Sequence, residues 1–187
     1  MSDIIQSVND ANKDKEELNE ENLKKKQKEN KLIVLLIIIS VCTILFNTFI
    51  AQLAQVNGSS MEPTMQNGQF LVVSKISKIS QDYERGDILI FNWEGRHLIK
   101  RLIGLPGETV QMKDNSIYIN GEKIEDYIDV EIQDYGILAE PITLKEDEYI
   151  FLGDNRNNSI DSRTFGVVKE SVIIGRVVCR ILPPTKF

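Results

Sequence analysis

A serine-containing turn could supply a nucleophile. Residues 58–65 read Gly-Ser-Ser-Met-Glu-Pro-Thr-Met, and serines flanked by glycine and proline most often only make a turn. A serine that does chemistry needs a base to take its proton. His97 is the only histidine, so a Ser-His-Asp arrangement would depend on His97 with Asp87. No serine has a lysine three positions after it, and the Gly-x-Ser-x-Gly pattern is absent, so two common serine-enzyme motifs are excluded.

Lysine can act as the base if it is neutral, and Lys100 stands where burial could make it so. A free lysine has a pKa of about 10.4, whereas an apolar environment disfavours the charged form. Residues 98–103 read Leu-Ile-Lys-Arg-Leu-Ile, so in a strand Lys100 shares one face with Leu98 and Leu102. A lysine that extends along the surface to reach water would give the same pattern. The local sequence leaves both interpretations open.

A third segment could support such a pair. Residues 153–163 read Gly-Asp-Asn-Arg-Asn-Asn-Ser-Ile-Asp-Ser-Arg and follow an apolar run at 149–152. The simpler interpretation is a solvated loop rich in turn residues. The functional interpretation is a hydrogen-bonded loop whose carboxylates hold arginines and whose hydroxyl holds an amine.

The elements that must position these segments begin with a membrane anchor. Residues 32–51 carry no charge, and a helix of this length spans roughly 30 Å, the thickness of a bilayer core. A buried helix of a soluble protein would show a polar face, and a cleavable secretion signal would have a shorter core and leader. We therefore expect a permanent transmembrane helix at 32–52.

The flanks of this run predict its orientation. Five lysines, at positions 24, 25, 26, 28 and 31, precede it, and no charged residue follows it until Glu62. Cytoplasmic flanks are enriched in lysine and arginine, so residues 1–31 are expected to form a flexible cytoplasmic tail, transiently helical around Lys13 to Lys28. Residues from 53 onward would then lie on the extracytoplasmic face of the cell membrane.

Residues 53–187 have the pattern of an antiparallel β domain. Gly, Asn, Asp and Pro separate short apolar or alternating runs at 70–73, 87–91, 98–103, 149–152 and 172–178. Asn120-Gly121 between two further runs predicts a hairpin, because both residues accept left-handed turn angles. We therefore expect a mainly β fold with an antiparallel, barrel-like domain, and a smaller excursion from it at about 109–145.

Composition argues against several partners and cofactors. The net charge of −6 argues against nucleic acid, which requires a basic surface. One histidine and two cysteines without a Cys-x-x-Cys spacing make no usual zinc site, so no metal or other cofactor is expected. Cys42 lies in the membrane run and Cys179 in a strand-like run, so we expect no disulfide between them.

Taken together, the three segments and the anchor resemble the type I signal peptidases, a family of membrane-bound serine proteases with a Ser-Lys pair. The resemblance covers roughly residues 30–180 and consists of four motifs in order. These are Val-Asn-Gly-Ser-Ser-Met-Glu-Pro-Thr at 56–64, Tyr-x-x-Gly-Asp-Ile-Leu at 83–89, Lys-Arg-Leu-Ile-Gly-Leu-Pro-Gly-Glu at 100–108 and the polar loop at 153–163.

The resemblance implies which residues do the chemistry. Ser60 would be the nucleophile, and Lys100 would be the general base that takes its proton. The backbone N–H of Ser60 would be one oxyanion donor. Some family members have a serine two positions before the nucleophile as a second donor. Here that position is Gly58, as in the Gram-positive members, so backbone or water would have to serve instead.

The resemblance also implies supporting residues, namely Ser159, Asp154, Arg101, Asp161 and Arg163. Ser159 would hydrogen-bond the amine of the general base and orient it. Asp154 would pair with Arg101, and Asp161 with Arg163. These contacts would hold the polar loop against the catalytic pair.

By the same resemblance, the substrates would be N-terminal signal peptides of exported preproteins, cut after an Ala-x-Ala-like site. The peptide would add as a strand between the strand before the serine and the strand that carries the lysine. Positions matching the lining of the substrate pockets are Val56, Gly58, Met61, Met65 and Ile99. The lipid bilayer and a nearby secretion translocon would be the other partners.

Two alternatives remain. A self-cleaving repressor-type protein also uses a Ser-Lys pair, but such proteins are cytosolic and carry a DNA-binding domain. A membrane-tethered β domain that binds exported chains without cutting them would need neither Ser60 nor Lys100.

Overall fold

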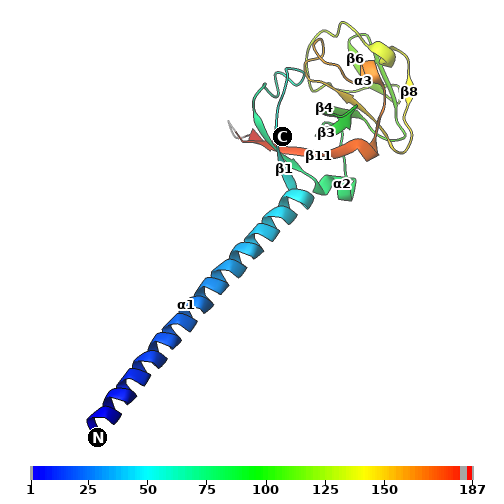
Figure 1. Ribbon diagram of the computed structural model, residues 1–187. Coiled ribbons are helices and arrows are strands. Elements are labelled where there is room, and N and C mark those ends of the chain that lie inside the picture. Colours follow the sequence, from blue (N-terminus) through cyan, green and yellow to red (C-terminus); the bar gives the residue numbers. More distant parts are fainter. Residues whose placement is uncertain (1, 182–184, 187) are drawn as a thin grey trace. The chain divides into compact units, whose positions relative to one another are not determined.

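The computed structural model describes residues 2–181, 185 and 186, and the chain forms two units (Figure 1). The first unit is Met1–Asn47 and the second is Thr48–Phe187. The first unit belongs to one long helix, and the second contains the strands. The mainly antiparallel β fold with one N-terminal apolar helix is therefore confirmed.

Helix α1 runs from Ser2 to Phe49. The tail that we expected to be flexible is thus helical, because residues 2–49 contain neither glycine nor proline and are rich in helix-forming lysine, glutamate and leucine. The part from Lys25 to Phe49 is exposed and contains an 18-residue window with a mean hydropathy of 2.7, so it is long and apolar enough for a membrane span by length and composition. The helix ends before the expected anchor end at 52, because Ala51–Gln55 forms strand β1.

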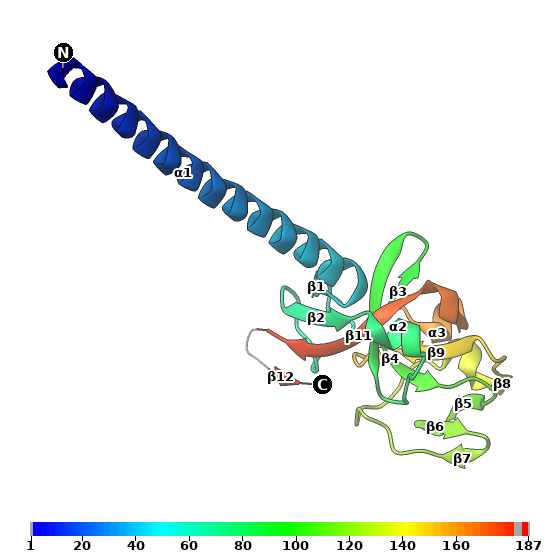
Figure 2. The ribbon, with the colours of Figure 1, turned by 90° about the horizontal axis from the view of Figure 1, so that it is seen from below.

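An antiparallel sheet of eight strands, in the order β1-β2-β11-β3-β4-β9-β10 with β12 beside β11, dominates the second unit (Figure 2). Its strands are β1 (Ala51–Gln55), β2 (Phe70–Ser74), β3 (Ile88–Trp93), β4 (Arg96–Gly104), β9 (Glu148–Leu152), β10 (Val168–Lys169), β11 (Ile173–Arg180) and β12 (Thr185–Lys186). The short helices are α2 (Ile76–Ser80) and α3 (Ser162–Phe165), with 3₁₀ turns η1 (Gly136–Ala139) and η2 (Glu170–Val172).

A second antiparallel sheet has the order β7-β6-β5-β8. It consists of β5 (Thr109–Lys113), β6 (Ser116–Ile119), β7 (Glu122–Lys123) and β8 (Ile142–Thr143), within the range expected for the excursion. Asn120 and Gly121 join β6 to β7 with φ angles of 53° and 84°, the left-handed conformation that this dipeptide accepts. Within the second unit this sheet lies at the opposite end from β1 and β2 (Figure 2).

The pairing of β4 changes along its length, and this positions the site. Residues 96–101 of β4 pair with β3, whereas pairing with β9 is confined to residues 101–104. The second edge of residues 96–100 therefore has no strand beside it among the described residues. Strand β1 pairs with β2 on one side only. Two open strand edges are thus available in the same unit.

Apolar packing fixes β4 from both sides. Leu102 packs in a cluster with Leu89, Phe91 and Phe151, while Ile103 packs in a second cluster with the smaller sheet. A register shift between Leu102 and Gly104 allows consecutive residues to enter different clusters. Burying such side chains stabilises the fold by about 1.5–3 kcal/mol each. The strand that carries Lys100 is therefore held firmly.

Candidate active site

Ser60 lies in a loop that leaves β1 and returns to β2. Backbone hydrogen bonds between Val56 and Gln69 (2.8 Å) and between Gly68 and Val56 (2.8 Å) close the base of this loop. Met61 and Met65 are buried beneath it at 2% and 0% exposure. The serine segment is thus a packed loop and not a solvated turn, and its apolar residues anchor Ser60 in place.

Lys100 contacts Ser60 directly. Lys100 Nζ donates a hydrogen bond to Ser60 Oγ at 2.5 Å. The Lys100 side chain is buried, with 2% of the residue exposed, so it does not extend to the surface. Burial lowers the pKa of Lys100 from 10.5 to about 8, although Asp161 and Asp154 attract its charge and oppose the shift. A lysine in this state can be neutral near physiological pH.

The polar loop at 153–163, which we call the catalytic loop, braces the backbone at the serine. The amide of Asn155 donates to the carbonyl of Ser60 at 3.0 Å, and the Asn155 side chain donates to the carbonyl of Ser59 at 3.1 Å. A side chain at Gly153 would overlap the carbonyl of Ser60, so only glycine allows this close approach. The loop therefore fixes the orientation of the Ser60 peptide.

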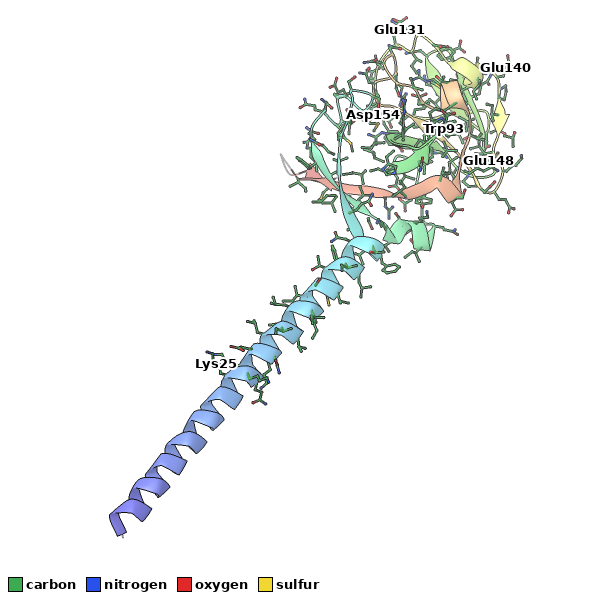
Figure 3. All side chains as sticks on the ribbon, viewed as in Figure 1. Lys25, Trp93, Glu131, Glu140, Glu148 and Asp154 are labelled. Carbon is green, nitrogen blue, oxygen red and sulfur yellow. The ribbon has the colours of Figure 1, made fainter. Side chains whose placement is uncertain are left out.

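Arg101 and Asp154 join the catalytic loop to β4. Arg101 Nε donates to Asp154 Oδ1 at 2.8 Å, and Nη2 donates to Oδ2 at 2.6 Å. Thr64, from the serine loop, donates to the same carboxylate at 2.5 Å. Asp154 is 1% exposed and lies inside the β unit, whereas Glu131 and Glu140 lie at its outer surface (Figure 3). One buried carboxylate thus ties together three segments of the site.

Asp161 and Arg163 form the second pair. Arg163 donates two hydrogen bonds to Asp161, from Nε and Nη2, each at 2.8 Å. Asp161 also accepts from the amide of Gly153 at 3.0 Å and caps helix α3 through the amide of Arg163. Both ends of the catalytic loop are thereby tied to one another.

Ser159 does not make the contact that we expected. The structure gives no hydrogen bond between Ser159 and Lys100, and within the described part of the chain the buried Ser159 Oγ has no partner. The hydroxyl packs instead against Gly153, where any side chain would overlap it. The Lys100 amine is bonded to Ser60, and Ser159 lines the same surface hollow as both residues.

A cavity of about 380 Å³ lies beside the pair. Residues of β1 and of the open edge of β4 line it together with Ser60 and Lys100. Four of the five expected substrate-contacting residues line it, namely Val56, Gly58, Met61 and Ile99. Met65 is not among the residues that line this cavity; it is fully buried in a core cluster that also contains Val56 and Met61.

His97 lies on the same open edge but is exposed, and no metal cluster accompanies it. Within residues 25–181, no group of three His, Cys, Asp or Glu side chains is placed to hold a metal ion. Over the same residues, no acceptor is bonded to the Ser60 amide, which leaves that N–H available to a ligand. The arrangement therefore offers a nucleophile, a base and one backbone donor.

Sequence analysis missed several residues that the structure places around this site. They are Thr64, Arg156, Asp126 and Tyr127. Thr64 and Arg156 belong to the quoted motifs, but the sequence did not indicate a role for either residue. Asp126 and Tyr127 lie in a stretch with no strand or helix pattern, and nothing local in the sequence shows that Asp126 contacts the catalytic loop or that Tyr127 contacts Arg101.

Comparisons with known proteins show which family the chain resembles. The family model "Signal peptidase, peptidase S26" matches residues 29–182. The chain is 38% identical to signal peptidase I P of Bacillus subtilis subsp. natto over 74% of this chain and 80% of the relative. It is 34% identical to signal peptidase I S of Bacillus subtilis strain 168 over 83% and 90% of the two chains. A crystal structure of a signal peptidase I from Enterococcus faecalis matches at 35% identity over 51% and 96% of the chains, with a TM-score of 0.44.

Proposed function

The chain belongs to the signal peptidase family, peptidase S26, and from this premise we propose that it is a membrane-bound serine endopeptidase that removes N-terminal signal peptides from exported proteins. Ser60 is the proposed nucleophile and Lys100 the proposed general base. The observation that carries this proposal is the 2.5 Å hydrogen bond between the Lys100 amine and Ser60 Oγ, two residues that line the cavity of about 380 Å³, which we call the groove.

The proposed reaction starts with neutral Lys100. With a pKa of about 8, about a tenth of the molecules hold a neutral amine at pH 7. As Ser60 Oγ attacks the carbonyl carbon of the scissile bond, Nζ takes the hydroxyl proton, and the Ser60 N–H donates to the developing oxyanion.

The second half releases both products. The Lys100 ammonium gives its proton to the leaving amine, the C–N bond breaks, and the signal peptide remains as an ester on Ser60. A water molecule then attacks the ester while Lys100 accepts its proton. Transfer of that proton back to Ser60 Oγ releases the peptide acid and restores the pair.

Substrate binding by strand addition is supported by the two open strand edges. Strand β1 and residues 96–100 of β4 both line the groove and have one edge unpaired in the described chain. An extended peptide can bond to both edges, with alternate side chains directed inward. Val56, Met61 and Ile99 line the cavity together with Ser60, and such apolar side chains in the subsites would favour small residues in an Ala-x-Ala-like site.

The proposed location is the cell membrane, with the N-terminus in the cytoplasm and the catalytic unit outside. The apolar span Lys25–Phe49 and the lysines that precede and begin it support this topology. In that location the enzyme meets preproteins as they leave the secretion translocon, and lipid is its second partner.

The test is cleavage of a synthetic leader peptide by the purified full-length protein in detergent. Wild type should cut once, after the Ala-x-Ala site, as read by mass spectrometry, and Ser60→Ala should lose the activity. Ser59→Ala is a matched control, because Ser59 is the adjacent serine and its hydroxyl contacts only Asn158 in the described chain. Equal loss in both variants, or no cleavage by wild type, would refute the assignment and favour a non-catalytic binding domain.

A further inference from the structure

An irregular segment of the second unit runs along the catalytic loop. Residues 125–135, which we call the strap, leave β7 and reach η1 without forming a helix or strand. Strap and catalytic loop are joined by side chains and backbone together. The contacts are Asp126 with Arg156, Asn157 with the Glu131 carbonyl (2.8 Å) and the Gln133 amide (3.0 Å), and Arg163 with the Asp134 carbonyl (3.0 Å).

The Asp126–Arg156 pair is the buried ionic contact between the strap and the catalytic loop. Arg156 is 1% exposed, and its guanidinium donates to both carboxylate oxygens of Asp126, with Nη2 to Oδ1 at 2.7 Å. Its Nε donates to the Gly153 carbonyl at 3.1 Å. A buried arginine without its carboxylate is strongly destabilising. The strap therefore neutralises a charge that the catalytic loop carries inside the protein.

Tyr127 reaches further, to the arginine that holds the catalytic loop. The guanidinium carbon of Arg101 lies 5.0 Å from the centre of the Tyr127 ring. The Tyr127 hydroxyl donates to the Arg85 carbonyl at 3.0 Å, and Arg101 Nη1 donates to the next carbonyl, that of Gly86, at 2.8 Å. A side chain at Gly86 would overlap the phenol. The Tyr127 ring, the turn at residues 85–86 and the Arg101 guanidinium therefore pack against one another.

We propose that Tyr127 is a positioning residue for the catalytic pair, acting by holding Arg101 in its bond to Asp154. This inference rests on the proposed function. Tyr127 itself does not line the substrate groove beside Ser60 and Lys100. It acts on them through three successive contacts: its ring with Arg101, Arg101 with Asp154 at 2.6 Å, and the neighbouring Asn155 amide with the Ser60 carbonyl at 3.0 Å.

Two substitutions separate the ring from the hydroxyl. Tyr127→Phe keeps the ring face for Arg101 and loses the bond to the Arg85 carbonyl, whereas Tyr127→Leu removes the ring as well. A cation–π contact of this kind predicts a loss of about fivefold in kcat for Tyr127→Leu. We expect Tyr127→Phe to stay within about twofold of wild type, and KM to change by less than about twofold in both variants.

The matched control is Tyr118→Leu. Tyr118 lies in β6 of the smaller sheet and also carries a cation on its ring, since Lys113 Nζ lies 4.7 Å from its centre. Tyr118→Leu therefore removes an aromatic ring and its contact with a cation, as Tyr127→Leu does, but at a position away from the catalytic loop. Tyr118→Leu should therefore keep wild-type kcat, even if its melting temperature falls as much as that of Tyr127→Leu.

The experiment measures kcat, KM and melting temperature of the full-length variants on the leader peptide, below the melting temperature of each. Cleavage by wild type and its loss in Ser60→Ala are measured in parallel, so the proposed function is judged separately. Wild-type kcat in Tyr127→Leu would overturn the inference, as would equal damage in Tyr127→Phe. A raised KM with unchanged kcat would also overturn it, because Tyr127 would then contact the peptide.

Discussion

Replacing Lys100 by methionine should abolish cleavage and at the same time stabilise the protein at neutral pH. Lys100 is 2% exposed and its folded pKa is about 8, against an ordinary 10.5. Below pH 8 the folded protein must bury an ammonium, which costs about 3 kcal/mol relative to the neutral amine. Methionine has a similar length and no charge, and it loses one hydrogen bond to Ser60, about 1 kcal/mol. The net stabilisation at pH 7 is therefore roughly 2 kcal/mol.

The pH dependence distinguishes this cause from better packing. Between pH 8 and 10.5 the unfolded chain still binds the proton that folded Lys100 has lost, so wild-type stability rises with pH across this window. The advantage of Lys100→Met should be greatest below pH 8 and should disappear by about pH 10.5. Guanidinium unfolding of the full-length protein in detergent, followed by tryptophan fluorescence at pH 7 and pH 10, measures the difference.

The control for this measurement is Lys123→Met, the same substitution at an exposed lysine of strand β7. Its stability difference from wild type should be small and should not change with pH. An advantage of Lys100→Met that stays constant from pH 7 to 10 would show that Lys100 is not held with a lowered pKa. The proposed role of Lys100 as a neutral base would then lose its physical basis.

Four further outcomes are expected. The value of kcat/KM should rise with pH, with its midpoint near pH 8 and with about 1% of the plateau value at pH 6; a flat profile would refute the lysine base. Lys100→Arg should be inactive, because guanidinium stays protonated. Asp161→Asn should move the midpoint lower, because Asp161 raises the pKa of Lys100; an upward shift would contradict this. His97→Ala should keep activity within a few fold, whereas a hundredfold loss in folded protein would favour a histidine base. Protease added outside spheroplasts should digest the β unit and spare residues 1–31, and protection of the β unit would reverse the topology.

The fold was predictable where the sequence has short-range periodicity. The uncharged run predicts the apolar helix, the alternating runs predict strands, and Asn120-Gly121 predicts the turn between β6 and β7. The helix over residues 2–31 is longer than the transient one expected at about 13–28, because charge and polarity were given more weight than helix propensity. The strap at 125–135 has neither periodicity nor turn pattern, since its conformation depends on contacts with a loop about thirty residues away.

The catalytic pair and its arginine pairs came from the family resemblance, and the geometry brings them together. Ser159 differs from the expectation because position in a motif does not determine the direction of a side chain. Ser159 turns toward Gly153, and Met65 turns into the core beneath the loop. Tyr127 was missed because a tyrosine facing an arginine across folded segments leaves no pattern in the chain.

The two arginine pairs have an electrostatic consequence as well as a positional one. Asp154 and Asp161 lie close enough to Lys100 to raise its pKa, and two free carboxylates beside a buried amine would hold it as an ammonium. Arg101 and Arg163 each bond both oxygens of their carboxylate, so most of the negative charge is offset. Desolvation then remains the dominant effect, and the pKa falls to about 8. The catalytic loop can therefore brace Ser60 with buried carboxylates while the pKa of Lys100 stays low enough for a fraction of the molecules to hold the neutral amine that the proposed reaction needs.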